Sequence, residues 1–377
     1  MLKVLLLLGL LVPALAGAHV KWFAASWDPA AAPIGLVELL GSPAFVALFA
    51  LALLVVAGAR SIDGRLAARR ALRRFLAGIE LKTSGRLPQI LRFGLAAYFV
   101  SIALYFHAEP ILLTPELKAG FWWMPMVQLG IALGLLFRSG VIPACMLIAL
   151  LYGRAAHVYG WVHMLDYHYF LGVIVLLLLD AWYGQRRAEL GLLVLRITVA
   201  TSFMWVAAEK WLYPHWTHEI LSQLLPPVLG SFDVHFSCTA AGFVEFALAF
   251  FILFGMAASQ IAALVLLSLL LAAIPFVGPV DAIGHLPLVV ALAILALTRN
   301  RWMRSRGAKR VPITGTFLFP FSLVALLMLY FFSHELGVLA PGFGSWPATV
   351  SHVAFASAAA YGATYLFVGW AQSSRCS

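Results

Sequence analysis

Charged residues are scarce in this chain of 377 residues: Asp, Glu, Lys and Arg together make up 11% of it, whereas hydrophobic residues make up 63%. So few charges cannot hydrate the surface of a soluble protein of this size, and the composition indicates a membrane protein with several spans. In a soluble protein the net charge of +10 would suggest a nucleic-acid partner. Here the basic residues lie in short segments between apolar runs, where they set topology, so we expect no nucleic acid.

Cysteine is also scarce, and the motifs of several enzyme classes are missing. The three cysteines, Cys145, Cys238 and Cys376, are too scattered for a metal motif. The sequence has no P-loop, no paired-glycine fingerprint, no GxSxG elbow and no long polar segment that could form a nucleotide-binding domain. These absences argue against an ATP-driven pump, and we expect no nucleotide partner.

Residues 1–18 have the pattern of a signal peptide: Lys3, an apolar run over 4–15, and the small residues 16–18 that suit signal peptidase. We expect cleavage to leave His19 as the mature N-terminus, and an uncleaved signal anchor is the alternative. The amine and imidazole of a terminal His19 would form a bidentate clamp, as in brace-like copper sites.

About eleven apolar stretches are long enough to cross a bilayer, so we expect an all-α polytopic transmembrane bundle with the lipid bilayer as its first partner. They lie near residues 35–59, 90–106, 121–137, 141–157, 168–185, 190–212, 237–255, 259–278, 284–298, 314–333 and 347–370. Residues 19–89 hold the first of them and a basic loop. Residues 299–377 hold a second basic loop and the last two.

Lysine and arginine orient these spans. Nearly all lysines and arginines fall in alternate loops, chiefly 60–89 and 299–313. Basic loops stay in the cytoplasm, so we expect these loops and the C-terminus on the cytoplasmic side of a bacterial inner membrane. The mature N-terminus would then be periplasmic. Within the first loop, residues 65–81 alternate basic and apolar positions at helical spacing, which predicts an amphipathic helix on anionic lipid.

On this topology all eleven histidines fall on the periplasmic side. Histidines that merely tolerate an interface should occur at both faces, so the bias predicts a metal, redox or proton site, with interfacial filling as the alternative. His215 and His218 share one face of a helical turn. His163, Met164, Asp166 and His168 form a second polar group, and imidazole, thioether and carboxylate together favour copper over magnesium or calcium. The predicted metal ligands are His19, His163, His168, His215, His218 and His285.

The chain also repeats itself. One offset aligns Arg92 with Arg196, and a second aligns Gln128 with Glu245 and His168 with His285. Because an even number of spans separates equivalent helices, the two copies run in the same direction. We expect two four-helix units, 90–189 and 190–298.

Three segments of the second unit resemble the DoxX family of small four-helix membrane proteins. They are residues 208–212 before a proline, Glu245 followed by residues 253–255, and residues 281–287 at the start of a helix. The resemblance implies two tandem DoxX-like units and a link to sulfur and quinone redox chemistry. The first unit departs from the pattern, because Gln128 replaces the acid and no lysine aligns with Lys210.

Glu245 lies near the middle of its span, where a charge is expensive and usually paired or protonated. We therefore expect Glu245 to exchange protons, with Lys210 and Asp281 as further candidate catalytic residues.

The leading hypothesis is a DoxX-like inner-membrane protein that binds a transition metal, copper above others, in membrane-linked redox or metal handling. A quinone and a periplasmic redox or metal-carrier protein would be its partners. The alternatives are a non-catalytic subunit or scaffold of a respiratory or sulfur-oxidising complex, and a small-solute transporter.

Overall fold

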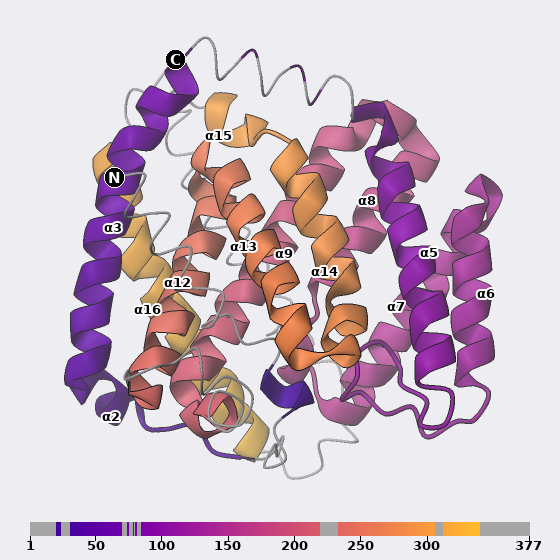
Figure 1. The fold of residues 1–377 in the computed structure, drawn as a ribbon, viewed down its shortest axis with the longest axis horizontal. Helices are drawn as coiled ribbons and strands as arrows, with labels where there is room; N and C mark the ends of the chain where they lie inside the picture. The colour runs from indigo at the N-terminus through magenta and orange to yellow at the C-terminus, as the bar shows by residue number, and fades with distance from the viewer. Residues whose placement is uncertain are drawn as a thin grey trace.

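The computed structural model describes residues 20–23, 31–69, 74, 78, 80, 84–218, 233–305 and 312–339. Within these ranges the chain is helical, with an isolated β-bridge between Ile111 and Lys118 and no strand. The long helices run up and down a single bundle (Figure 1). The all-α prediction is therefore confirmed.

Eight helices of the described part are long and apolar enough to cross a membrane, and two more apolar helices are shorter. The eight are α3 (Pro43–Ala68), α5 (Leu87–Tyr105), α7 (Val141–Tyr159), α9 (Ala188–Leu212), α12 (Val234–Phe254), α13 (Ala258–Val277), α14 (Pro279–Leu297) and α16 (Pro312–Leu339). The shorter two are α6 (Met124–Leu136) and α8 (Tyr169–Tyr183). These are the helices of a multi-pass membrane protein, and they coincide with ten of the eleven expected stretches.

Four expectations concern residues that the structure leaves undescribed in whole or in part. The signal peptide, the eleventh stretch at 347–370 and His19 lie outside the described ranges. Most of the amphipathic helix expected at 65–81 does as well, although α3 continues through Ala68.

Local sequence explains where several helices begin and end. Ser42 caps α3 by accepting the backbone N–H of Phe45 at 3.4 Å, and Asp233 caps α12 by accepting that of Phe236 at 2.8 Å. Gly278 separates α13 from α14 at a φ of 94°, a conformation that glycine adopts without strain. α14 therefore begins at Pro279, five residues before the expected start, which puts Asp281 and His285 in its first two turns.

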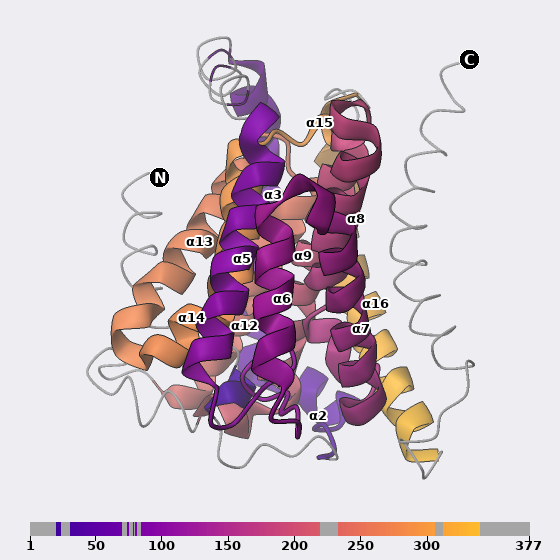
Figure 2. The same ribbon diagram turned by 90° about the vertical axis from the view of Figure 1, so that its right-hand side faces the viewer.

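The helices form two four-helix groups that pack side by side. In the first group α5, α6, α7 and α8 pack in succession, and α8 returns to α5. In the second group α9, α12, α13 and α14 do the same, and α14 returns to α9. The groups meet where α8 packs against α9 and α5 against α14, while α3 and α16 cover α12 on the outer side (Figures 1 and 2).

The arginines that the repeat aligns make matching contacts. Arg92 donates to the carbonyls of Leu135 and Leu136 at 2.9 and 2.8 Å, where α6 ends. Arg196 donates to the carbonyl of Ile252 at 3.4 Å, near the end of α12, and the second offset aligns Ile252 with Leu135. The last carbonyls of a helix lack intrahelical partners, so each buried guanidinium satisfies the end of its neighbouring helix.

Helix direction separates the basic residues from the histidines. Nine of the eleven histidines lie in the described ranges, and all nine fall at the end of the bundle drawn lowest in Figure 1, here called the histidine end. They are His107, His157, His163, His168, His215, His218, His235, His285 and His334. The opposite end, here called the arginine end, holds most of the described arginines, including Arg60, Arg65, Arg69, Arg138, Arg186, Arg187, Arg299 and Arg301.

Candidate functional site

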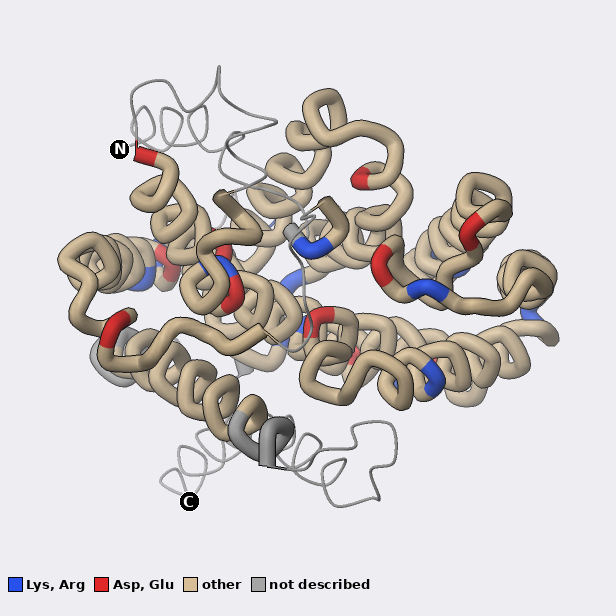
Figure 3. The backbone as a smooth tube through the Cα atoms, turned by 90° about the horizontal axis from the view of Figure 1, so that it is seen from below, with Lys and Arg blue, Asp and Glu red and all other residues tan. Residues whose placement is uncertain are grey.

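A group of buried ionisable side chains lies at the histidine end, between the two four-helix groups. We call it the charged cluster; it consists of Lys21, Glu116, His163, Asp166, Glu209, Lys210, Glu245, Asp281 and His285. Each of these side chains is at most 8% exposed. Figure 3 looks onto this end and shows basic and acidic positions of separate segments near one another. Burying ionisable side chains within a membrane protein costs free energy, and such groups usually serve a function.

Lys21 connects the two groups of helices. It lies in the short helix η2 (Val20–Trp22), and its Nζ is 2.5 Å from Asp166 Oδ2 and 2.5 Å from Glu209 Oε1. Asp166 belongs to η5 (His163–Asp166), just before α8, whereas Glu209 belongs to α9. Burial alone would lower the pKa of Lys21, but the two carboxylates outweigh it and raise that pKa above its usual value. Lys21 is thus a fixed cation between two acids.

His163 extends this part of the cluster toward the loop that precedes α6. Its Nδ1 is 3.3 Å from Lys21 Nζ, and its Nε2 is 3.6 Å from Glu116 Oε1. Tyr167 lies beside it, with ring centroids 5.9 Å apart. Burial, with Glu116 and Asp166 nearby, holds the pKa of Tyr167 well above its usual value. The phenol therefore keeps its proton and can donate a hydrogen bond.

Lys210 and Glu245 form the deepest ion pair of the cluster, with Nζ and Oε2 2.7 Å apart. Side chains of a helix tilt toward its N-terminus. α9 runs toward the histidine end and α12 runs away from it, so Lys210 tilts inward along the bundle while Glu245 tilts outward. The two side chains therefore meet although they begin at different depths. The carboxylate of a mid-span glutamate thus has its counter-charge inside the protein.

Asp281 and His285 form a third pair one helical turn apart on α14. The His285 Nδ1 is 2.9 Å from Asp281 Oδ1, and His285 also lies within electrostatic range of Glu245. Trp22, the neighbour of Lys21, packs on the His285 ring with centroids 4.5 Å apart. Gly284 makes room for this contact, because a Cβ there would come within 2.3 Å of the Trp22 ring. η2 therefore contacts Asp166 and Glu209 through Lys21, and His285 of α14 through Trp22.

The cluster contains more acid than base. Five carboxyl groups face two ammonium groups, which gives a net charge of −3 with both imidazoles neutral and −1 with both protonated. Within the described part of the chain, Asp166 Oδ1 and Asp281 Oδ2 accept no hydrogen bond. An uncompensated charge is very unfavourable away from water, so the acidic excess of the whole cluster favours a proton on at least one of its five carboxyls.

The five predicted metal ligands in the described part, His163, His168, His215, His218 and His285, do not form one metal site. His168 uses both ring nitrogens in hydrogen bonds, one to the Leu165 carbonyl and one to Thr201 Oγ1, and burial lowers its pKa to about 4. His215 and His218 are exposed, and His215 packs its ring beside Trp216. Among the described residues no three His, Cys, Asp or Glu side chains are grouped as a metal site. The metal site therefore stays a prediction.

Sequence reasoning selected Glu245, Lys210, Asp281, His163 and His285, and the structure places all five in the charged cluster. It missed the roles of Lys21 and Glu116. Lys21 carries one usable signal, since it is among the few basic residues on the side that the arginines avoid. Glu116 lies in a loop without a motif, and only the fold brings it to His163.

No family model, no curated protein and no solved structure matches this chain.

Proposed function

We propose that this protein takes up and releases protons through the charged cluster, as part of membrane-linked chemistry at the histidine end. The acidic excess of the buried cluster carries the proposal. Five carboxyls and two lysines leave a net negative charge even when both histidines are protonated, and only a proton on one or more carboxyls can neutralise it. Buried ionisable groups of this kind mark proton relays in many membrane proteins.

The contacts supply an order for proton movement. His163 is the least buried member and contacts both Glu116 and Lys21. Lys21 keeps its own proton and positions Glu209, which feels the charge of its neighbour Lys210, and Lys210 pairs with Glu245. The pairs Glu116–His163, His163–Lys21, Lys21–Glu209 and Lys210–Glu245 are 2.5 to 3.6 Å apart, and Glu209 is adjacent to Lys210 in the sequence. Small rearrangements therefore suffice to pass a proton among the imidazole and carboxyl groups. Glu245 is then the innermost proton site.

Infrared spectroscopy of the purified protein tests the protonation itself. At neutral pH we expect the C=O stretch of a buried protonated carboxyl, and its loss in one of the variants Glu209→Gln, Glu245→Gln and Asp281→Asn. Glu109→Gln is the matched control, because the Glu109 side chain is 78% exposed and pairs with Lys118, outside the charged cluster. Absence of the band from the unmodified protein would overturn the proposal.

A vesicle assay tests function. Proteoliposomes containing a pH-sensitive dye should show faster proton entry after an external acid jump than empty vesicles. Glu245→Gln should abolish this difference, whereas Glu109→Gln should leave it unchanged. Equal rates in protein-containing and empty vesicles would limit the cluster to local proton exchange coupled to another reaction.

The finer assignment rests on the sequence resemblance. We propose two tandem DoxX-like units in a bacterial inner membrane, with quinone-linked redox chemistry as the process that uses the proton. The matching contacts of Arg92 and Arg196 support the repeat. Transport of a solute with protons would use the same cluster, and accumulation of solute in the vesicles would distinguish the two.

A transition metal, copper above others, is a second proposal. The gathering of nine described histidines at one end favours it. Metal content of the purified protein, measured for copper, zinc and iron, tests it. A near-stoichiometric metal that is lost in His163→Ala would support a site at the cluster, and no metal after reconstitution would remove the proposal.

A further inference from the structure

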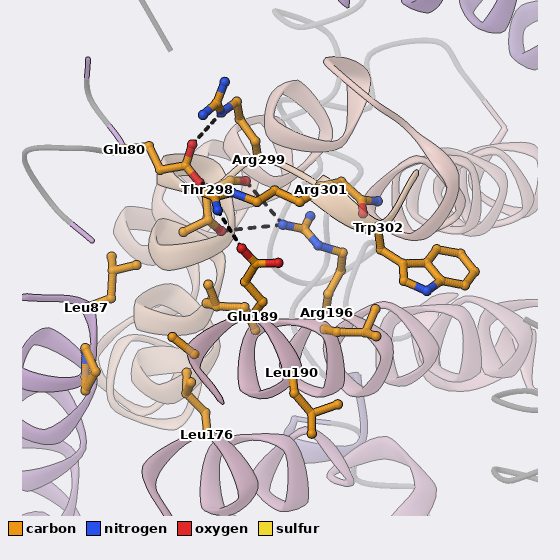
Figure 4. Close-up of a pocket in the computed structure, with 15 residues that line it drawn as sticks. Glu80, Leu87, Leu176, Glu189, Leu190, Arg196, Thr298, Arg299, Arg301 and Trp302 are labelled. Carbon is orange, nitrogen blue, oxygen red and sulfur yellow. Dashed lines mark hydrogen bonds and ion pairs between the residues drawn. The ribbon is translucent and has the colours of Figure 1, made fainter. Parts of the chain in front are cut away.

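A cavity of about 470 Å³ lies at the arginine end, at the other end of the bundle from the charged cluster. Figure 4 shows the residues that line it. Residues of α5, α8 and α9 line it, together with the segment that follows α14, so both groups of helices form its walls. Its volume falls within the usual range for small-ligand sites.

One side of the cavity is polar. Glu80 pairs with Arg299 and with Arg301, the latter at 3.2 Å, and Arg301 pairs with Glu189 at 2.5 Å. Figure 4 shows these side chains converging above Arg196, which donates to the Thr298 carbonyl at 3.2 Å. Three arginines and two glutamates line the cavity, a net charge of +1.

The other side is apolar and reaches the surface that would face lipid. Leu87, Leu176, Leu190 and Leu193 line it, and Leu190 is 44% exposed near the start of α9. The short helix η6 (Gly184–Arg187), directly before α9 in the chain, carries Arg186 and Arg187. The cavity thus combines a basic rim with an apolar wall at the level where a span begins.

We propose that this cavity binds the headgroup of an anionic phospholipid, with the acyl chains along the Leu190 side. Basic pockets between spans recognise such headgroups through charge and hydrogen bonds. The terminal nitrogens of Arg299 make no hydrogen bond with the described part of the chain, and the Arg301 side chain is 52% exposed. Both guanidinium groups can therefore take a phosphate, for which their planar donors are well suited.

Charge and shape favour this ligand over two others. A free phosphate would gain nothing from the leucine wall. A neutral quinone would gain little from the excess positive charge, and the buried Arg196 already donates to Ile252, Ser259 and Thr298.

Thermal unfolding in detergent tests the proposal, with phosphatidylglycerol, phosphatidylcholine, inorganic phosphate or a quinone added separately. Phosphatidylglycerol should raise the unfolding temperature of the unmodified protein by several degrees more than any other addition. Arg299→Gln should remove at least half of that difference. Arg138→Gln, at an exposed arginine of the same end, should retain it.

Three results would overturn the inference. They are an equal shift with phosphatidylcholine, an equal shift with inorganic phosphate or quinone, and an equal loss in Arg138→Gln. Leu190→Trp provides a second variant that keeps every charge and narrows the apolar side. It should lose the phosphatidylglycerol effect as well, and full retention in both Leu190→Trp and Arg299→Gln would place the lipid elsewhere.

Discussion

At the residue scale, the cost of burying charge governs the charged cluster. An ion pair away from water is stable only if both partners stay, since the removal of one leaves the other uncompensated. Lys210 and Glu245 are such a pair, with side chains 0% and 8% exposed. Their contribution to the free energy of unfolding is therefore best measured by changing both residues together.

Lys210→Met and Glu245→Gln should each lower the free energy of unfolding by about 3 kcal/mol, because each leaves one partner buried alone. The double variant should lose much less than the sum, because it leaves no unpaired charge. Thermal unfolding of the four proteins in one detergent measures this. Additive losses would show that the two side chains act independently.

His168 makes the stability depend on pH. Burial lowers its pKa from 6.5 to about 4, so between these values the unfolded chain binds a proton that the folded chain does not. The contribution of His168 is present above pH 6.5 and is lost as pH falls toward 4, by on the order of 3 kcal/mol. In His168→Gln the decline in unfolding temperature over this window should be shallower. An unchanged slope would contradict the assignment.

At the element scale, η2 depends on a glycine of α14. A side chain at position 284 would collide with the Trp22 ring that packs on His285. η2 is three residues long and has no core of its own, so its position depends on this contact and on Lys21.

Gly284→Ala should therefore destabilise the protein by forcing Trp22 away from His285, although alanine is the better helix former. Gly130→Ala is the control, because Gly130 also lies in a helix and its added Cβ meets nothing within 4 Å. There we expect a gain of about 0.5 to 1 kcal/mol. Unfolding temperatures that move in opposite directions would agree with this account, and a gain in both would contradict it.

At the scale of the whole molecule, the two ends differ in charge, which should fix orientation in the membrane. The arginine end should face the cytoplasm. With Cys376→Ser as background, Glu109→Cys should react with an impermeant thiol reagent from outside intact cells. Arg138→Cys should react only after lysis, and Cys145 and Cys238 are buried. Labelling of Arg138→Cys from outside would reverse the orientation.

Hydropathy was enough to predict the helices and the separation of the two ends, because apolar length and loop charge act locally along the chain. Glu245 was found for the same reason, since a lone acid in an apolar span is visible in the sequence. Its partner, and the contacts of Lys21 and Glu116, follow from packing between distant helices. The metal site predicted from the histidines stays a prediction, although in the described part His168 hydrogen-bonds to Leu165 and Thr201 and the ring of His215 packs beside Trp216.

The contacts of Lys21 also impose an order on biosynthesis. Lys21 is separated by 145 residues from Asp166 and by 188 from Glu209, so it leaves the ribosome long before its partners exist. Contacts at such separations form late, after the helices between them have been inserted. We therefore expect η2 to bind between the two groups of helices in one of the last steps of folding.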